Sequence, residues 1–337
     1  MLKTLGAQVK EFKKDSFLTP VFMIGEVIME TVIPLLMASI IDNGVNGNDG
    51  RGDMKHIYVI GGLMVVTALL SLTFGIMGGK YGARASAGFA RNLRKAMYEN
   101  IQTFSFANID KFSTSGLVTR LTTDVTNMQN AYQMILRMCM RAPATLICAM
   151  IMSFVISPRL ASVYLVAVIF LACVLALIVS QATKHFMQAF PKYDELNESV
   201  QENVSAIRVV KAYVREDYEI SKFKKASNNI YKIFCKAESI VIWNNPVMNL
   251  TVYTCILAIS WLGAHMIVQD SLTTGQLMNM LTYCMNILMS LMMLSMIFVM
   301  TTMSAASARR ICEVLEEKAD LSNPEEPVME VADGSIV

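Results

Sequence analysis

Six apolar stretches, each close to the length that crosses a lipid bilayer, constrain this chain more than any other feature. A membrane-spanning helix needs about 20 consecutive apolar residues. Only 17% of the residues are charged, whereas a typical soluble domain carries about 25%. The third stretch reaches full length if it extends back to Ile135. The sequence therefore predicts an all-α membrane protein with six transmembrane helices, at residues 17–41, 57–79, 142–157, 160–183, 239–269 and 271–308.

Lysine and arginine are shared very unequally among the segments that connect these stretches. Three lie in the short connections, whereas 24 lie in the two long connections and the terminal segments, which cover residues 1–16, 80–134, 184–238 and 304–337. Because cytoplasmic loops carry the excess of positive residues, we expect both termini and both long connections in the cytoplasm. The protein is then a multi-pass protein of the cell membrane.

Both long connections have the pattern of helical hairpins. No proline lies between Ile57 and Phe104, and apolar residues recur every four positions from Tyr81 onward. One helix of 48 residues is therefore expected, which at about 1.5 Å per residue would be roughly 72 Å long. Such a helix exceeds twice the hydrocarbon thickness and must project about 40 Å into the cytoplasm. The return path and the second long connection repeat this design.

A short helix is expected across the tip of each hairpin. At the first tip Phe106, Ile109 and Phe112 recur every three residues. At the second tip three basic residues would share one face of a helix, namely Arg208, Lys211 and Arg215. A solvated surface without a partner is the alternative interpretation of these basic residues.

Cysteine use and net charge exclude several classes of protein. The seven cysteines form no C-x-x-C pair and lie mostly in apolar stretches, so neither a disulfide framework nor a metal site is expected. A net charge of +2 is too small to indicate a nucleic-acid partner. The first apolar stretch, with 25 residues, is too long for a signal peptide and indicates a retained span.

Four segments, taken together with the six spans and two hairpins, resemble the transmembrane domain of ABC exporters. They read FSTSGLVTRLTTDV at 112–125, ENVSAIRVVKAYVRE at 202–216, LTTGQL at 272–277 and ARRICEVL at 308–315. The resemblance covers essentially residues 1–315 and is closest to the subunits of bacterial heterodimeric multidrug exporters. Ala206 departs from the pattern, because the family commonly has glycine there. A bacterial inner membrane is the location that this resemblance implies.

The resemblance also implies a division of the chain. Residues 1–15 would form an amphipathic elbow helix on the inner leaflet, residues 16–315 the six-helix transmembrane domain, and residues 316–337 a linker with the start of a nucleotide-binding domain. No phosphate-binding loop of the form G-x-x-x-x-G-K-[ST] occurs, so we expect a truncated piece without a catalytic site. ATP and Mg²⁺ would bind the missing domain, and the full-length protein would be an ATP-hydrolysing translocase.

By the same resemblance, the hairpin tips at 108–113 and 206–213 would be coupling helices that dock on ATPase domains. Ile109 and Phe112 are expected to present apolar side chains to the ATPase domain. The full set of expected docking residues is Ile109, Asp110, Lys111, Phe112, Ile207, Arg208 and Lys211.

A stripe of methionines in the sixth span is one candidate substrate surface. Methionine is flexible and polarizable, and it is over-used on promiscuous binding surfaces. The candidate residues are Met285, Met289, Met292, Met296 and Phe298. The alternative interpretation is that methionine is simply the generic apolar residue of a chain that contains 27 of them.

Two carboxylates in the first span are the other candidates for substrate binding. Glu26 and Glu30 lie one helical turn apart, and a carboxylate within the membrane must face the bundle interior. Arg141 lies at the same depth as Glu26, so a structural ion pair between these two is expected. Glu30 has no evident partner and is the better candidate to bind a positively charged substrate.

These observations favour one half of a dimeric, ATP-driven exporter of amphipathic, drug-like molecules. Its partners would be a second six-helix half-transporter, nucleotide-binding domains, membrane lipid and small amphipathic substrates, without nucleic acid. Peptide or lipid cargo is the alternative within the exporter class. Proton-coupled secondary transporters often show broken spans and midplane sites between internal repeats. Here the hairpins extend far outside the membrane instead, which disfavours such a transporter using Glu26 and Glu30. A receptor or scaffold without transport is the third class.

Overall fold

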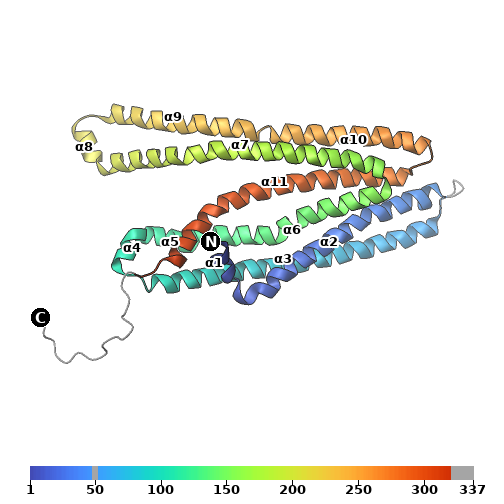
Figure 1. Ribbon diagram of the computed structural model, residues 1–337, viewed down its shortest axis with the longest axis horizontal. Helices are drawn as coiled ribbons and strands as arrows, with labels where there is room; N and C mark the ends of the chain where they lie inside the picture. Colours follow the sequence, from blue (N-terminus) through green and yellow to red (C-terminus); the bar gives the residue numbers. More distant parts are fainter. Residues whose placement is uncertain (48–51, 320–337) are drawn as a thin grey trace, which may run out of the picture. The chain divides into compact units, whose positions relative to one another are not determined.

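The structure, a computed structural model, describes residues 1–47 and 52–319 and is shown in Figure 1. Within these residues every regular element is a helix. The expected linker and domain start at 316–337 lie outside the described residues from 320 onward. The α-helices are α1 (Leu2–Ala7), α2 (Lys13–Ser39), α3 (Met54–Ile101), α4 (Phe106–Phe112), α5 (Thr114–Thr119), α6 (Val125–Ile156), α7 (Pro158–Ser205), α8 (Ile207–Ala212), α9 (Glu216–Val241), α10 (Asn244–Val268) and α11 (Thr274–Glu316).

Six helical segments among the described residues are long and apolar enough to cross a membrane. The predicted all-α class with six transmembrane helices is therefore confirmed, and the chain is a multi-pass membrane protein. The six segments are Lys10–Asn46, Met54–Ile101, Thr114–Ile156, Pro158–His185, Glu216–Val268 and Thr274–Leu294.

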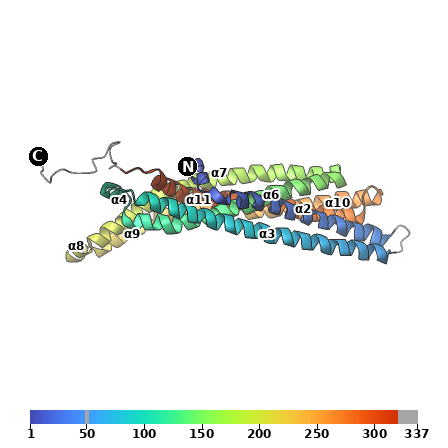
Figure 2. The same cartoon turned by 90° about the horizontal axis from the view of Figure 1, so that it is seen from below.

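The helix α3 is unbroken over its 48 residues, as both views show (Figure 1, Figure 2). It begins three residues earlier than the predicted start at Ile57. The reason is Asp53, whose Oδ1 accepts the backbone N–H groups of Lys55 at 2.9 Å and His56 at 3.2 Å. These contacts satisfy N–H groups that have no partner inside the helix, so the first turn forms ahead of the apolar run.

The fifth predicted span, 239–269, is divided between two helices. The first of them, α9, continues to Val241, and α10 begins at Asn244. Pro246 is the physical reason, because proline lacks an N–H donor and its ring collides with the carbonyl of the residue four positions earlier, here Ile242. A defined break therefore separates the polar arm α9 from the apolar helix α10 within the segment Glu216–Val268.

Two compact units make up the chain, and each is described by itself. The first unit comprises residues 1–33 and 61–145 together with the described residues from 293 onward. Its buried core joins α1, the second half of α3, the tip of the hairpin and the last turns of α11. The core residues are Leu5, Phe89, Ala90, Leu93, Met97, Phe112, Leu117, Val125, Ala308, Ile311, Cys312 and Val314.

The second unit comprises the described residues between 34 and 60 and residues 146–292. Here α7 packs along α9 and α10 (Figure 1). Tyr164 of α7 is buried, and its Oη donates to the carbonyl oxygen of Met280 in α11 at 2.7 Å. Asp42 Oδ1 accepts the N–H of Gly275 at 2.8 Å, which places a carboxylate at the positive end of α11.

The N-terminal segment differs from the single amphipathic elbow helix that was expected at 1–15. After α1 ends at Ala7, Lys10 adopts a left-handed backbone with φ of 41° and a 3₁₀ turn leads into α2. Leu5 lies in the core of the first unit, and Asn92 Nδ2 donates to the carbonyl of Gln8 at 3.0 Å. Leu5 is therefore covered by protein, whereas an amphipathic elbow helix on the inner leaflet would turn its apolar side chains to lipid.

Candidate functional site

A reciprocal pair of hydrogen bonds begins the tip helix of the first hairpin. Ser105 Oγ accepts the N–H of Asn108 at 3.4 Å, and Asn108 Oδ1 accepts the N–H of Ser105 at 3.1 Å. This capping box satisfies two N–H groups that would otherwise lack partners. The helix α4 ends at Phe112, and Ser113 follows with φ of 55°, so the chain turns sharply into α5.

The position of Phe112 corrects one expectation about this tip. Phe112 is buried in the core of the first unit, where its ring stacks on Phe104 with 5.8 Å between centroids. The guanidinium of Arg120 lies 4.8 Å from the same ring, within the range of a cation–π contact. The expectation that Phe112 presents its side chain to an ATPase domain is therefore wrong. The other expected docking residues here are half-buried or exposed: Ile109, Asp110 and Lys111.

Phe106 takes the place at the surface that was assigned to Phe112. Its side chain is 88% exposed, although phenylalanine is among the residue types that are most often buried. A helix has 3.6 residues per turn, so a three-residue spacing drifts by about 60° per step and puts Phe106 and Phe112 on different faces. That drift was the signal in the sequence that could have identified Phe106.

The tip of the second hairpin is almost entirely exposed. α8 spans Ile207–Ala212, inside the expected 206–213. All three expected docking residues are exposed, and Lys211 Nζ lies 3.0 Å from Glu216 Oε1. Val214, with φ of 51°, holds a left-handed backbone that a β-branched residue rarely adopts. Exposed apolar side chains gather here, namely Ile207, Val209, Tyr213, Val214 and Tyr218.

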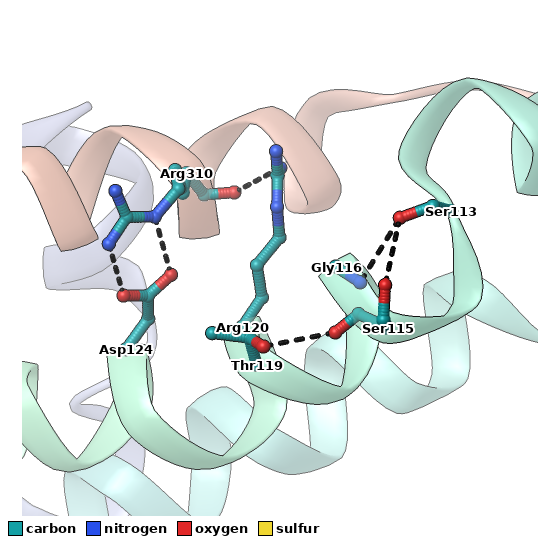
Figure 3. A pocket seen from close by; sticks show the side chains of 7 residues that line it. All are labelled: Ser113, Ser115, Gly116, Thr119, Arg120, Asp124 and Arg310. Atoms are coloured by element: carbon teal, nitrogen blue, oxygen red, sulfur yellow. Dashed lines mark hydrogen bonds and ion pairs between the residues drawn. The ribbon is translucent and has the colours of Figure 1, made fainter. Parts of the chain in front are cut away.

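The buried side chain of Asp124 connects the last turns of α11 to the first hairpin. Asp124 accepts the Nε–H of Arg310 at 2.7 Å and the hydroxyl of Ser307 at 2.9 Å, as Figure 3 shows for the arginine. Arg120 Nη1 donates to the carbonyl of Arg310 at 2.8 Å and also lies 3.0 Å from Glu313 Oε2. Removing one partner from such a buried, charged network is costly.

A polar hollow of about 290 Å³ opens beside this network. Figure 3 shows the hydroxyls of Ser113 and Ser115 on one side and Arg120 with Arg310 on the other. Asp124 neutralises the charge of Arg310, which leaves Arg120 as the other charged group among the residues that line the hollow. Sequence periodicity did not indicate this group, because the partners come from segments almost two hundred residues apart.

The two carboxylates of the first span share one arginine. Arg141 Nη1 donates to Glu26 Oε1 at 2.8 Å, and Arg141 Nη2 donates to Glu30 Oε1 at 2.8 Å and Oε2 at 2.9 Å. The expected contact between Glu26 and Arg141 is present, whereas the expectation that Glu30 lacks a partner is wrong. With both carboxylates ionised, this triad (Glu26, Glu30 and Arg141) carries one excess negative charge.

The burial of the triad is uneven. The Glu26 side chain is 13% exposed and that of Glu30 is 42% exposed. Gly75 of α3 leaves room for the buried carboxylate, since a Cβ there would come within 3.2 Å of Glu26 Oε1. Glu26 Oε2 is buried without a hydrogen-bond partner. Of the two carboxylates, Glu30 is therefore the one that a molecule outside the chain can reach more easily.

The methionine stripe of α11 lies on the surface of the chain. Met289 is 70% exposed, and the other candidates share an exposed face. Tyr283, close to the stripe in sequence, is fully buried, and the side chain of Phe298 lies outside the described residues. The exposed members of the stripe are Met285, Met289, Met292, Met296 and Met300.

Within residues 1–47 and 52–319, no three His, Cys, Asp or Glu side chains gather closely enough to hold a metal ion. The charged groups described above are joined by hydrogen bonds and ion pairs within the first unit. Their arrangement connects α2 with α6 at the triad and α11 with the first hairpin at Asp124.

Comparison with known proteins gives the family. The chain is 32% identical over 300 residues to the uncharacterized ABC transporter ATP-binding protein YfiB of Bacillus subtilis. This match covers 89% of the present chain and 52% of YfiB. It is 29% identical to the uncharacterized ABC transporter ATP-binding protein Rv1273c of Mycobacterium tuberculosis, over 97% of this chain and 56% of that protein.

A third relative, "Probable multidrug resistance ABC transporter ATP-binding/permease protein YheI" of Bacillus subtilis, is 26% identical over 55% of this chain and 32% of that protein. The chain spans about half the length of the curated relatives it matches most fully. The family profile described as the ABC transporter transmembrane region matches residues 16–292. This chain belongs to the ABC transporter transmembrane family, with the all-α, six-span fold of its exporters.

Proposed function

We propose that this chain is the permease half of a dimeric, ATP-driven exporter that moves amphipathic, drug-like molecules out of the cytoplasm. The observation that carries this proposal is the pair of hairpin tips, each of which exposes apolar side chains on a short helix. Phe106 does so on α4 and Val209 on α8. Apolar side chains at the end of a long polar arm are explained by a protein that docks there.

Docking at the tips implies which proteins would be the partners of this chain. An ATPase domain on each tip would bind ATP and Mg²⁺, and a second six-helix half-transporter would complete the pathway. The names of the relatives include ATP-binding, which supports an ATPase domain in the complete protein. With the excess of basic residues at the hairpins, both termini would lie in the cytoplasm and the spans in a bacterial inner membrane.

The substrate class rests on the surfaces that the spans offer. The exposed methionines of α11 provide a flexible apolar face. Glu30, with its partly exposed side chain and the excess negative charge of the triad, provides an anionic contact for a positively charged head group. Amphipathic molecules with a cationic end match both surfaces, and the multidrug name of one relative agrees with them.

The experiment that tests this proposal changes the tip of α4. Phe106→Asp in the intact protein, together with its second half in proteoliposomes, should lower dye transport at least tenfold and leave the thermal stability unchanged. Tyr98→Asp is the matched control, because Tyr98 is an exposed aromatic on the arm of the same hairpin. Wild-type transport by Phe106→Asp would contradict docking at this tip.

A further inference from the structure

The end of α11 is held by side chains of the first hairpin. The last carbonyls of a helix have no partners inside it, and at an exposed end water usually satisfies them. Here Asn100 Nδ2, at the end of α3, donates to the carbonyl of Val314 at 2.7 Å and to that of Glu317 at 3.0 Å. The amide thus replaces two bonds that the ending helix cannot make.

A second amide, that of Asn108, continues the contact beyond α11. Its Nδ2 donates to Glu317 Oε1 at 3.0 Å and to the carbonyl of Lys318 at 3.2 Å. Its Oδ1 accepts from the N–H and the hydroxyl of Ser105, at 3.1 and 2.7 Å. The side chain is 2% exposed, and an asparagine amide offers two donors and two acceptor positions. Each of them is used.

An ion pair reinforces these two amides. Lys111 Nζ lies 2.8 Å from both carboxylate oxygens of Glu317. Lys111 was expected to contact an ATPase domain, but in this structure its charge is satisfied by Glu317. Thr4 Oγ1 of α1 donates to Glu316 Oε1 at 2.6 Å, so the same short segment is also held from the N-terminal side.

We propose that Asn100, Asn108 and Lys111 clamp the segment Val314–Lys318 to α4, so that the tip of the first hairpin and the exit of α11 move as one body. This inference rests on the proposed function for its consequence: force from an ATPase domain that follows the exit would reach α4 through the clamp as well as through docking. Asn100 and Asn108 are then positioning residues for coupling.

Asn108→Asp separates the clamp from the capping of α4. Aspartate keeps the oxygen that accepts from Ser105 but loses both donors, and it adds a negative charge beside Glu317. Hydrogen–deuterium exchange of residues 314–318 in the intact protein, in nanodiscs without ATP, should become about tenfold faster. Exchange of residues 106–112 should keep its wild-type rate.

The double variant Asn108→Asp with Glu317→Gln restores a donor on the opposite side, because the glutamine amide can donate to the aspartate. It should recover most of the protection of 314–318. Gln102→Ala is the matched control, since Gln102 is an exposed amide directly after the end of α3, two residues from Asn100. Unchanged exchange of 314–318 in Asn108→Asp, or equal loosening of α4, would overturn the clamp.

The consequence for coupling is measured separately, as the ratio of substrate-stimulated to basal ATP hydrolysis. It should fall severalfold in Asn108→Asp and recover in the double variant. A wild-type ratio in a variant whose exit segment exchanges fast would overturn the role in coupling. The exchange measurement needs no ATP. It therefore tests the clamp even if the protein is not an ATP-driven exporter.

Discussion

At the residue scale, the sharing of Arg141 between two carboxylates decides what each substitution in the triad does. Glu26 and Glu30 both contact the guanidinium, so loss of one carboxylate leaves the arginine paired and removes the excess charge. Loss of the arginine instead leaves two carboxylates facing each other without a cation. A buried charge without its partner costs about 3–5 kcal/mol.

We therefore predict that Arg141→Gln lowers the free energy of unfolding by about 3–5 kcal/mol, whereas Glu26→Gln or Glu30→Gln alone changes it by less than about 1 kcal/mol. The double variant of both glutamates should be as unstable as Arg141→Gln. Thermal unfolding in detergent measures these differences, and Arg159→Gln, an exposed arginine outside the triad, is the control. A large loss in Glu30→Gln alone would show that the three charges do not act as one group.

The carboxylate of Glu317 makes the clamp sensitive to acid. The hydrogen bond from Lys111 is the largest effect on the pKa of Glu317 and lowers it below its ordinary value of 4.5. Burial, the second-largest effect, raises the pKa, and the hydrogen bond from Asn108 and the lysine charge lower it again. A carboxylate with a lowered pKa in the folded state stabilises above its ordinary pKa, and this stabilisation is lost as the pH falls through the lowered pKa. The contact is thus complete at neutral pH.

We predict that the titration of Glu317 has its midpoint below 4.5 and that Lys111→Met moves it upward. The carboxyl ¹³C shift of labelled glutamate reports this titration, with Glu317→Gln to identify the signal. Asp110→Asn, a change of an exposed neighbour, should leave the midpoint where it is. An identical midpoint in wild type and Lys111→Met would show that the ion pair does not form in solution.

At the element scale, α4 has two phenylalanine side chains, one in the buried core and one at the surface. Phe112 is part of the buried core, and removal of a core phenylalanine costs about 3–5 kcal/mol. Phe106 lies at the surface, where a substitution changes stability by about 0.5 kcal/mol or less. Phe112→Ala should therefore unfold the protein at a lower temperature, whereas Phe106→Ala should not.

The same pair of variants separates stability from coupling. Phe106→Ala should reduce the substrate stimulation of ATP hydrolysis although it folds normally. Chemical denaturation and ATP hydrolysis, measured on the same preparations, provide both readings. Equal destabilisation by the two variants would mean that Phe106 packs inside the protein, in disagreement with the structure.

The elements themselves were largely predictable, since each depends on local pattern. The unbroken 48-residue α3 and the tip helices α4 and α8 follow from proline placement and apolar spacing. Boundaries were shifted where one polar residue or proline intervened, as at Asp53 and Pro246. The direction of Phe112 was misjudged because a spacing of three residues does not keep side chains on one helix face.

The partners of charged residues were less predictable, because they depend on contacts between distant segments. Depth along the spans brought Glu26 and Arg141 together, but the same arginine reaches Glu30, which lies 111 residues away in sequence. Asp124 and Arg310 are 186 residues apart, and Asn108 is 209 residues from Glu317. No periodicity within a helix contains such information.

At the scale of the whole molecule, the central claim is that ATP, used by domains docked on the hairpin tips, drives amphipathic molecules across the membrane. In this proposal the spans contribute the exposed methionine stripe and the triad, and the tips of the hairpins are the helices on which ATPase domains dock. The proposal includes a second six-helix half, which would complete the pathway.

The most direct test is the accumulation of a fluorescent cationic amphipathic dye in inside-out proteoliposomes that contain the intact protein and its second half. The account predicts accumulation that requires ATP and Mg²⁺, stops when either half is omitted, and is lost in Phe106→Asp. Accumulation driven by an imposed proton gradient without ATP, or ATP-dependent movement of a labelled lipid without any movement of the dye, would contradict it.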